Sequence, residues 1–194
     1  MPGGQLDLRV FTSDTGQWEA RRFPVTVNIS DEIYFCPPPI LGQSGTLYWV
    51  PYTGNLAISY NNATGANAGG SATVITLPNR PGDGGWNRCI GERHGGGLRY
   101  MQSNSLVLQV WDADDSYAAQ GGGGHDMSWV HKVGAVELMK RNPEAAAFLR
   151  NKTPSTWDHR QLKSVGVHPI DDDVIFLELP GVKLWSPTPL SMER

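Results

Sequence analysis

The stretch that decides the fold runs from residue 97 to residue 112 and reads Gly-Leu-Arg-Tyr-Met-Gln-Ser-Asn-Ser-Leu-Val-Leu-Gln-Val-Trp-Asp. Apolar and aromatic residues gather at both ends of the stretch, at residues 98–101 and 106–111. Between them, Ser103, Asn104 and Ser105 are the residue types that favour a turn. The stretch therefore predicts a β-hairpin.

The same pattern occurs earlier in the chain, at residues 45–61. Leu47 and Tyr60 are 13 positions apart (60 − 47), and so are Leu98 and Trp111 (111 − 98). The two copies are offset by 51 positions (98 − 47). Because a sheet of four strands with its turns takes roughly 40 to 50 residues, a hairpin that recurs at this period indicates repeated four-stranded sheets.

The strands on either side of these hairpins extend the repeat, so that residues 1–194 are predicted to form a single partial β-propeller. Residues 33–77 and 89–133 each supply a complete four-stranded blade. Residues 8–27 supply a half blade, equivalent to the third and fourth strands of a unit. Residues 162–185 supply the first three strands of an incomplete blade.

Equivalent positions in the units carry equivalent residues. Phe11, Tyr60 and Trp111 are spaced 49 (60 − 11) and 51 (111 − 60) positions apart in the third strand. The second and third strands are apolar on both faces, as expected when blades stack face to face and bury both surfaces. In the blade formed by residues 33–77, the first strand is predicted at residues 33–35.

One helical insert, at residues 136–161, interrupts the pattern. Asn142 can cap a helix, Pro143 fits its first position, and Glu144 favours the positive end of its dipole. The predicted fold class is therefore all-β: a partial β-propeller of four-stranded antiparallel blades, two complete and two incomplete, with one short crossover helix.

Composition and charge restrict the functional classes. The chain is 39% hydrophobic and 18% charged, which fits a globular protein. A formal charge of −3 argues against nucleic-acid and anionic-membrane partners, and no apolar run approaches the ~18 residues of a membrane span. Cys36 and Cys89 lie in no CxxC motif, and no secretory signal opens the chain, which favours a cytoplasmic or nuclear location.

Two motifs are similar to known functional loops. The sequence from His94 to Gly97 is similar to the oxyanion loop of esterases, but no Gly-x-Ser-x-Gly nucleophile elbow accompanies it, so it is predicted to be a turn before a strand. Asp112, with the acidic residues at 114 and 115 and Ser116, is similar to a calcium loop. Because the glycine and glutamate of that loop are missing from its sixth and twelfth places, a solvated loop is predicted instead.

The remaining polar residues predict no chemistry. Asp171, Asp172 and Asp173 favour an exposed turn, with a weak cation site as the alternative. The histidines show no HxH or HExxH spacing, and His131 and His168 are predicted to be structural residues on strands. No GxGxxG links a strand to a helix. The sequence therefore predicts no catalytic residue, no metal and no cofactor, and it leaves the binding residues unassigned.

Four pieces of the chain, residues 8–18, 44–50, 97–112 and 165–185, resemble the F-box associated, kelch-like β-propeller of plant F-box proteins, particularly those of grasses. The resemblance covers nearly the whole chain. In that family an N-terminal F-box binds the Skp1-type adaptor of a cullin-based ubiquitin ligase, and the propeller presents a protein substrate. The residues before Leu8 contain no F-box, so adaptor binding is expected only if one lies upstream, and the chain is expected to be a fragment or a truncated relative.

The resemblance implies a non-catalytic protein-binding module that recognises a ubiquitin-ligase substrate. A kelch-like propeller enzyme and a sugar-binding propeller remain the alternatives. Because incomplete blades at both ends cannot close a ring within one chain, the chain alone is expected to associate through its terminal blades or to fold poorly.

Overall fold

A computed structural model of the chain describes residues 4–25, 38–51, 55–61, 70–78, 87–94, 96–104, 106–113, 127–141, 143, 163–168 and 170–178. Its elements are β1 (Gly4–Thr12), β2 (Gln17–Val25), β3 (Ile40–Leu41), β4 (Thr46–Trp49), β5 (Leu56–Asn61), β6 (Ser71–Thr76), β7 (Asn87–Glu92), β8 (Leu98–Ser103), β9 (Val107–Ala113), β10 (Ser128–Gly134), α2 (Ala135–Arg141), β11 (Lys163–Val167) and β12 (Ile175–Glu178).

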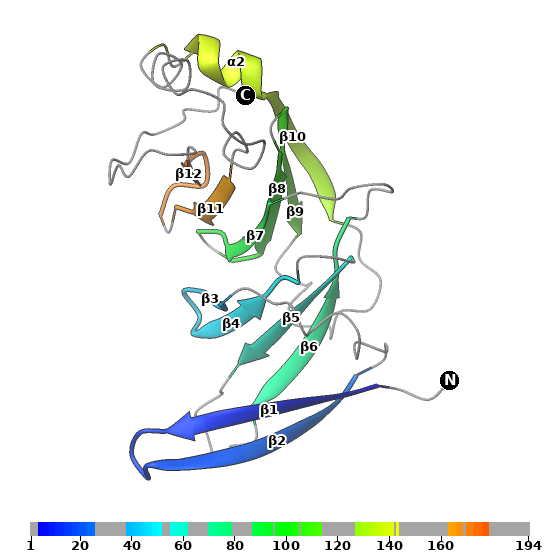
Figure 1. The fold of residues 1–194 in the computed structure, drawn as a ribbon, viewed down its shortest axis with the longest axis vertical. Helices are drawn as coiled ribbons and strands as arrows, with labels where there is room; N and C mark the ends of the chain where they lie inside the picture. The colour runs from blue at the N-terminus through cyan, green and yellow to red at the C-terminus, as the bar shows by residue number, and fades with distance from the viewer. Residues whose placement is uncertain are drawn as a thin grey trace, which may run out of the picture.

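Within these residues the strands form four antiparallel sheets. The first blade has the order β3-β4-β5-β6, and the second blade consists of β7 to β10, again in chain order across the sheet. Two hairpins complete the set: the N-terminal half-blade β1-β2 and the C-terminal half-blade β11-β12. Figure 1 shows the sheets stacked along the long axis, with β1 and β2 at one end. The fold is therefore all-β, a partial propeller with two complete and two incomplete blades, as predicted.

Both hairpins that the sequence predicts are present, as β4-β5 and β8-β9, but their registers differ. Leu47 lies opposite Tyr60 in the first blade, whereas Trp111 lies opposite Tyr100 in the second, two residues from Leu98. The second hairpin is tighter because the side-chain oxygen of Asn104 accepts hydrogen bonds from the backbone N–H groups at positions 106 and 107. A shift of two residues keeps each side chain on its face of the sheet.

Among the described residues, the strand that pairs with β4 is Ile40–Leu41, with Leu41 opposite Leu47. A tight turn places it there, since the N–H of Gly42 donates to the carbonyl of Thr46 at 2.8 Å. The predicted strand at residues 33–35 and the predicted last strand, at residues 182–185, lie outside the described residues.

The helix begins earlier than predicted. Helix α2 follows β10 directly and has Glu137 in its first turn and Lys140 and Arg141 in its last, as the helix dipole favours. Glu137 and Arg141, four residues apart, form an ion pair at 3.0 Å. Pro143 is also helical, whereas residues 144–150 lie outside the described part of the chain.

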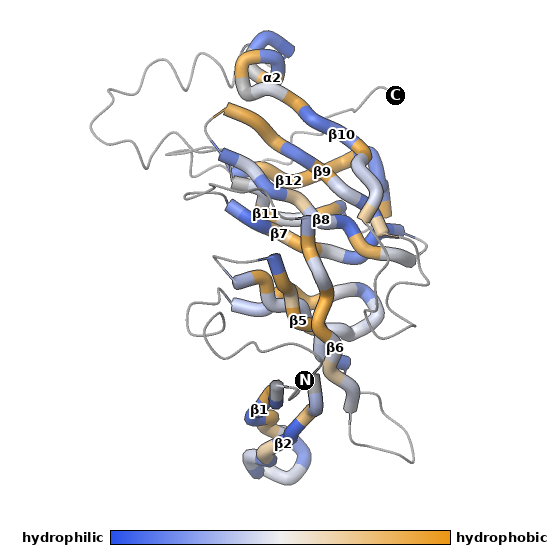
Figure 2. The backbone as a smooth tube through the Cα atoms, turned by 90° about the vertical axis from the view of Figure 1, so that its right-hand side faces the viewer, coloured by the Kyte–Doolittle hydropathy of each residue, from blue (hydrophilic) through white to orange (hydrophobic). Residues whose placement is uncertain are grey.

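The core lies between the sheets as three apolar clusters. Leu6 and Ile58 centre the cluster between the N-terminal half-blade and the first blade. Tyr100 and Trp111 belong to the cluster between the two complete blades, and Cys89 and Met101, among others, meet Ile175 of the C-terminal half-blade. Every residue of β8 is buried, so both faces of this strand pack, as the stacked arrangement requires. Figure 2 shows the same stack from the side, coloured by hydropathy.

Candidate functional site

Four turns between paired strands lie along one edge of the stack, which we call the turn edge. It consists of the connections β1-β2, β3-β4, β7-β8 and β11-β12, which all point to the left in Figure 1. Three of these turns are closed by a backbone hydrogen bond from the N–H before the turn to the carbonyl after it: Gly42 to Thr46, Arg93 to Gly97, and His168 to Val174. The turn edge therefore presents side chains from all four sheets on rigid turns.

A carboxylate from the second blade fixes the β3-β4 turn. Glu92 accepts a hydrogen bond from the backbone N–H of Ser44 at 2.7 Å, and others from the Ser44 hydroxyl and from Tyr48 at 2.8 Å. Burial, together with the hydrogen bond and charge of Glu92, raises the pKa of the Tyr48 phenol above its ordinary value. A Cβ at Gly42 would lie 2.5 Å from this carboxylate, so the contact requires glycine there.

The next turn is held in the same way by the next sheet. Asp172, in the β11-β12 turn, accepts a hydrogen bond from the backbone N–H of His94 at 2.8 Å. Its other oxygen lies 3.1 Å from the Arg93 guanidinium. Each of these two turns therefore takes a carboxylate from the sheet that follows it in the chain.

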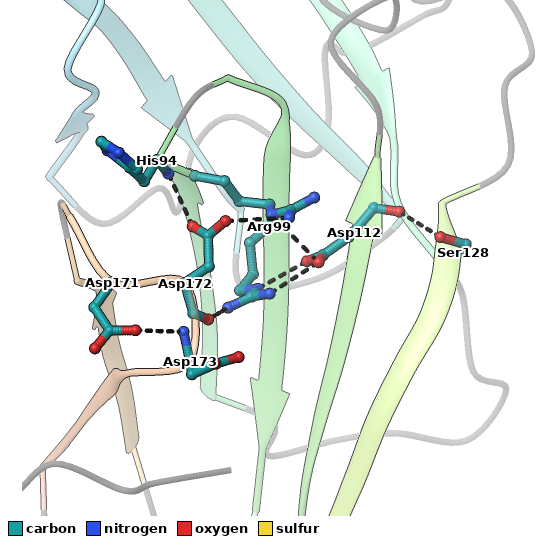
Figure 3. Close-up of polar contacts among 8 residues, drawn as sticks. His94, Arg99, Asp112, Ser128, Asp171, Asp172 and Asp173 are labelled. Carbon is teal, nitrogen blue, oxygen red and sulfur yellow. Dashed lines mark hydrogen bonds and ion pairs between the residues drawn. The ribbon is translucent and has the colours of Figure 1, made fainter. Parts of the chain in front are cut away.

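A buried ion pair lies beneath the β7-β8 turn. Arg99 and Asp112 face each other across β8 and β9, and the guanidinium donates to both carboxylate oxygens, at 2.7 and 2.8 Å. The two side chains are only 5% and 11% exposed. Arg99 also donates to the backbone carbonyl of Asp172 (Figure 3). Arg93 lies 3.4 Å from Asp112. The network ties the second blade to the C-terminal half-blade.

The environment of Arg99 favours its charged form. Burial acts to lower the pKa of this guanidinium, but the hydrogen bond and charge of Asp112, with the charges of Asp172 and Asp173, raise it overall. The pair is bidentate, which is the strongest geometry for an arginine and a carboxylate. This arrangement serves to join sheets.

The prediction that Asp112 lies in a solvated loop is wrong. Asp112 belongs to β9, and its side chain is directed at Arg99 on the facing strand. Sequence spacing could not show this pairing, because Asp112 is bound to a residue 13 positions away across a hairpin whose register the turn at Asn104 sets. The other members of the suggested calcium loop, at residues 114–116, lie outside the described residues.

The structure also places the remaining predicted residues. The β11-β12 turn holds Asp171 and Asp173 exposed, as predicted, and the Nδ1 atom of His168 accepts the N–H of Asp171 at 3.0 Å. His168 is thus structural, though it lies just beyond β11, and His131 lies on β10. His94, Gly96 and Gly97 lie in the turn before β8, as predicted, with φ angles of 107° at Gly96 and 78° at Gly97.

Among the residues that the structure describes, no group of three or more His, Cys, Asp or Glu side chains is arranged to hold a metal ion. In the same part of the chain, no helix has the length and apolar character that crossing a membrane requires.

Exposed apolar side chains are the other feature of the turn edge. Leu41, the last residue of β3, is 68% exposed, and Ile170, in the β11-β12 turn, is 69% exposed. Phe11 and Trp18, on either side of the β1-β2 turn, are also exposed, with their ring centroids 5.3 Å apart. Apolar side chains exposed on rigid supports are typical of surfaces that bind other proteins.

Comparisons of this chain with protein-family models, with curated proteins and with solved structures found no match. Its function is therefore inferred from the surface and from the chemistry of its residues.

Proposed function

We propose that this chain is a non-catalytic protein-binding module that recognises a substrate for a Skp1-cullin-F-box ubiquitin ligase. The observation that supports the proposal is the turn edge, where Leu41, at the end of β3, and Ile170, in the β11-β12 turn, are exposed on different sheets. A carboxylate orders the turn beside each of these side chains. Glu92 accepts a hydrogen bond from the β3-β4 turn, and Asp172, in the β11-β12 turn, accepts one from the β7-β8 turn. Apolar side chains on supports that are already ordered lose little entropy on binding.

The polar groups near this edge favour binding over catalysis. A catalytic acid or base has to reach a substrate and exchange a proton with it. Arg99 and Asp112 instead face each other between sheets. Glu92 is directed at the β3-β4 turn, and Asp172 at the β7-β8 turn. These four side chains stabilise the fold by contacts within the protein. The exposed turn edge is then the surface that contacts a partner.

The proposal names its partners by chemistry. The substrate is a protein with an apolar segment that fits between Leu41 and Ile170, and binding takes place in the cytoplasm or nucleus. The Skp1-type adaptor is bound only through an F-box joined upstream of this chain. Neither nucleic acid nor membrane is a partner, in keeping with a formal charge of −3.

Capture followed by ubiquitination tests this proposal. The chain is immobilised and exposed to a plant extract, in parallel with a variant carrying Leu41→Glu and Ile170→Glu. Leu106→Glu is the matched control, because Leu106 is 74% exposed in the turn at the opposite edge. We expect one set of proteins to bind the chain and the control and to be lost from the variant, while all three unfold at the same temperature.

A second step separates a substrate from a chance binder. The chain is fused to an F-box and combined with adaptor, cullin and ubiquitin enzymes, and the captured protein is added. We expect ubiquitin to be transferred to it by the fusion and not by the double variant. Equal capture by the chain and the double variant, or binding to a glycan array in place of protein, would show that the proposal is wrong.

A further inference from the structure

The two half-blades are complementary parts of one blade. Strand β2 lies against β6, the fourth strand of the first blade, so β1 and β2 occupy the third and fourth places. Strand β11 lies against β7, the first strand of the second blade, and the β11-β12 turn bonds the β7-β8 turn through Asp172. Strands β11 and β12 therefore occupy the first and second places.

Each half-blade has an edge with no partner among the described strands. There, β12 pairs with β11 alone and β1 pairs with β2 alone. In both complete blades, the second strand pairs antiparallel with the third, as β4 with β5 and β8 with β9. Among the described strands, the pairing that is missing is therefore β12 with β1. Figure 1 shows these two strands far apart, at different ends of the stack.

An exposed aromatic pair marks the same missing contact. Phe11 and Trp18 are direct cross-strand partners with ring centroids 5.3 Å apart, and Trp111 and Trp129 repeat this arrangement in the second blade, also at 5.3 Å. Trp111 is 4% exposed because the first blade packs against it, whereas Phe11 is 51% exposed. Phe11 thus has the residue type and position of a buried blade contact, and no sheet in the described part of the chain covers it.

We infer that two copies of this chain close one six-bladed ring, in which β12 of each copy pairs with β1 of the other. The two half-blades of one chain cannot meet without a ring of three blades, fewer than the usual ~4 to 8. Two copies supply four complete blades, and their four half-blades combine into two more. The contact continues the blade-on-blade stacking already present in each chain, and a closed ring leaves no unpaired half-blade.

The registers of the complete blades predict which residues meet. Ile175 follows its turn as Leu47 and Leu98 follow theirs, so the first-blade register places Phe11 of one copy opposite Ile175 of the other. The second-blade register places it opposite Leu177. Both side chains belong to the apolar cluster beneath the second blade, so Phe11 joins that cluster in either register. Phe176 points to the other face, toward the first blade of the other copy.

Sedimentation velocity over a range of concentrations tests the mass of the assembly. We expect a reversible equilibrium between the monomer and a species of twice its mass, with nothing larger, because the ring is closed. A chain that stays monomeric at about 100 µM, some hundredfold above a dissociation constant of ~1 µM, would overturn the inference. So would an open series of larger species, since a head-to-tail contact that does not close forms filaments.

Two substitutions test the surfaces. Phe11→Glu and Phe176→Glu each place a charge at both composite blades of the dimer. A central apolar contact is worth about thirtyfold, and it is lost twice, so each variant should weaken dimerisation by about a thousandfold. Leu106→Glu, at the turn on the opposite edge, should leave it unchanged. If either of the first two variants fails to fold, hydrogen exchange of the unmodified chain decides. Backbone amides of β1 and β12 should gain protection as concentration rises, and equal exchange at both concentrations would contradict the pairing.

Mixing the two variants distinguishes the proposed pairing from other dimers. In a mixed dimer, one composite blade takes β11-β12 from the Phe11→Glu copy and β1-β2 from the Phe176→Glu copy, and both halves are then unmodified. The other composite blade carries both glutamates, and a blade already disrupted by one charge loses little more to a second. The mixture should therefore dimerise more tightly than either variant alone. A contact of β1 with β1 would give no such gain, and that result would show the inference to be wrong. No binding partner is needed, so the outcome is independent of the proposed function.

Discussion

Replacing Arg99 by methionine should destabilise the protein more than any other single change to its charged residues. The substitution keeps much of the side-chain volume and removes the two hydrogen bonds to Asp112, at 2.7 and 2.8 Å. It also removes the bond to the carbonyl of Asp172. Asp112 would then remain buried without its main counter-charge, which typically costs about 3–5 kcal/mol. Since Arg93 stays 3.4 Å away, we expect about 3 kcal/mol.

Urea unfolding of a double-mutant cycle measures this cost. Asp112→Leu alone should also destabilise the protein, because it leaves the Arg99 guanidinium buried. The double variant, Arg99→Met with Asp112→Leu, should lose no more than about 2 kcal/mol, since an apolar pair can replace a buried ion pair at little cost. The matched control is Arg141→Met, which breaks the exposed pair with Glu137 and should cost less than about 0.5 kcal/mol.

Two results would refute the reasoning. One is a cost for Arg99→Met as small as that of the Arg141 control, which would mean that water reaches the buried pair. The other is a double variant whose loss equals the sum of the two single losses, because strict additivity would show that Arg99 and Asp112 do not interact.

Three further predictions concern other side chains. Glu92→Gln should destabilise the protein by about 1–2 kcal/mol, because a neutral amide accepts more weakly from Ser44 and Tyr48 than a carboxylate does; urea unfolding of the variant beside Glu19→Gln checks this. The raised pKa of Tyr48 means that the folded state holds the phenolic proton more tightly than the unfolded state, so stability should be full below pH 10.0 and fall above it. The loss of stability above pH 10.0 should be smaller in the Tyr48→Phe variant. Equal dependence of stability on pH in the two proteins would contradict this prediction. Burial raises the pKa of the Cys89 thiol to about 12, so in a Cys36→Ser background a thiol reagent should modify it only as fast as the chain unfolds.

Most of the fold follows from the sequence because it depends on local patterns. Residues 98–111 alternate on two buried faces, and Ser103 and Asn104 begin a turn, so the hairpin can be predicted without any distant contact. The helix shows the limit of such signals. Its prediction followed a capping residue at Asn142, whereas the residues from Ala135 to Arg141 are good helix formers that need no cap signal after a strand.

The candidate site was less accessible to sequence reasoning. The contact between Arg99 and Asp172 joins residues 73 positions apart, and that between Glu92 and Ser44 joins residues 48 apart. Both depend on how one sheet stacks on the next, which no local pattern encodes. In addition, the sequence pattern of acidic residues beside a loop predicts that they are exposed to solvent. The register that directs Asp112 inward is set by a turn at the other end of the hairpin.

The direction of the contacts between carboxylates and turns has a consequence for synthesis on the ribosome. Each turn donates a backbone hydrogen bond to a carboxylate that is synthesised later. The acceptor for the N–H of Ser44 is Glu92, and the acceptor for the N–H of His94 is Asp172, 78 positions further along the chain. A nascent chain that ends before Glu92 therefore carries a first blade whose turn lacks its acceptor. These contacts form only when the next sheet has left the ribosome. The growing chain should therefore become resistant to proteases in steps, and each sheet should become resistant after the sheet that follows it has been synthesised.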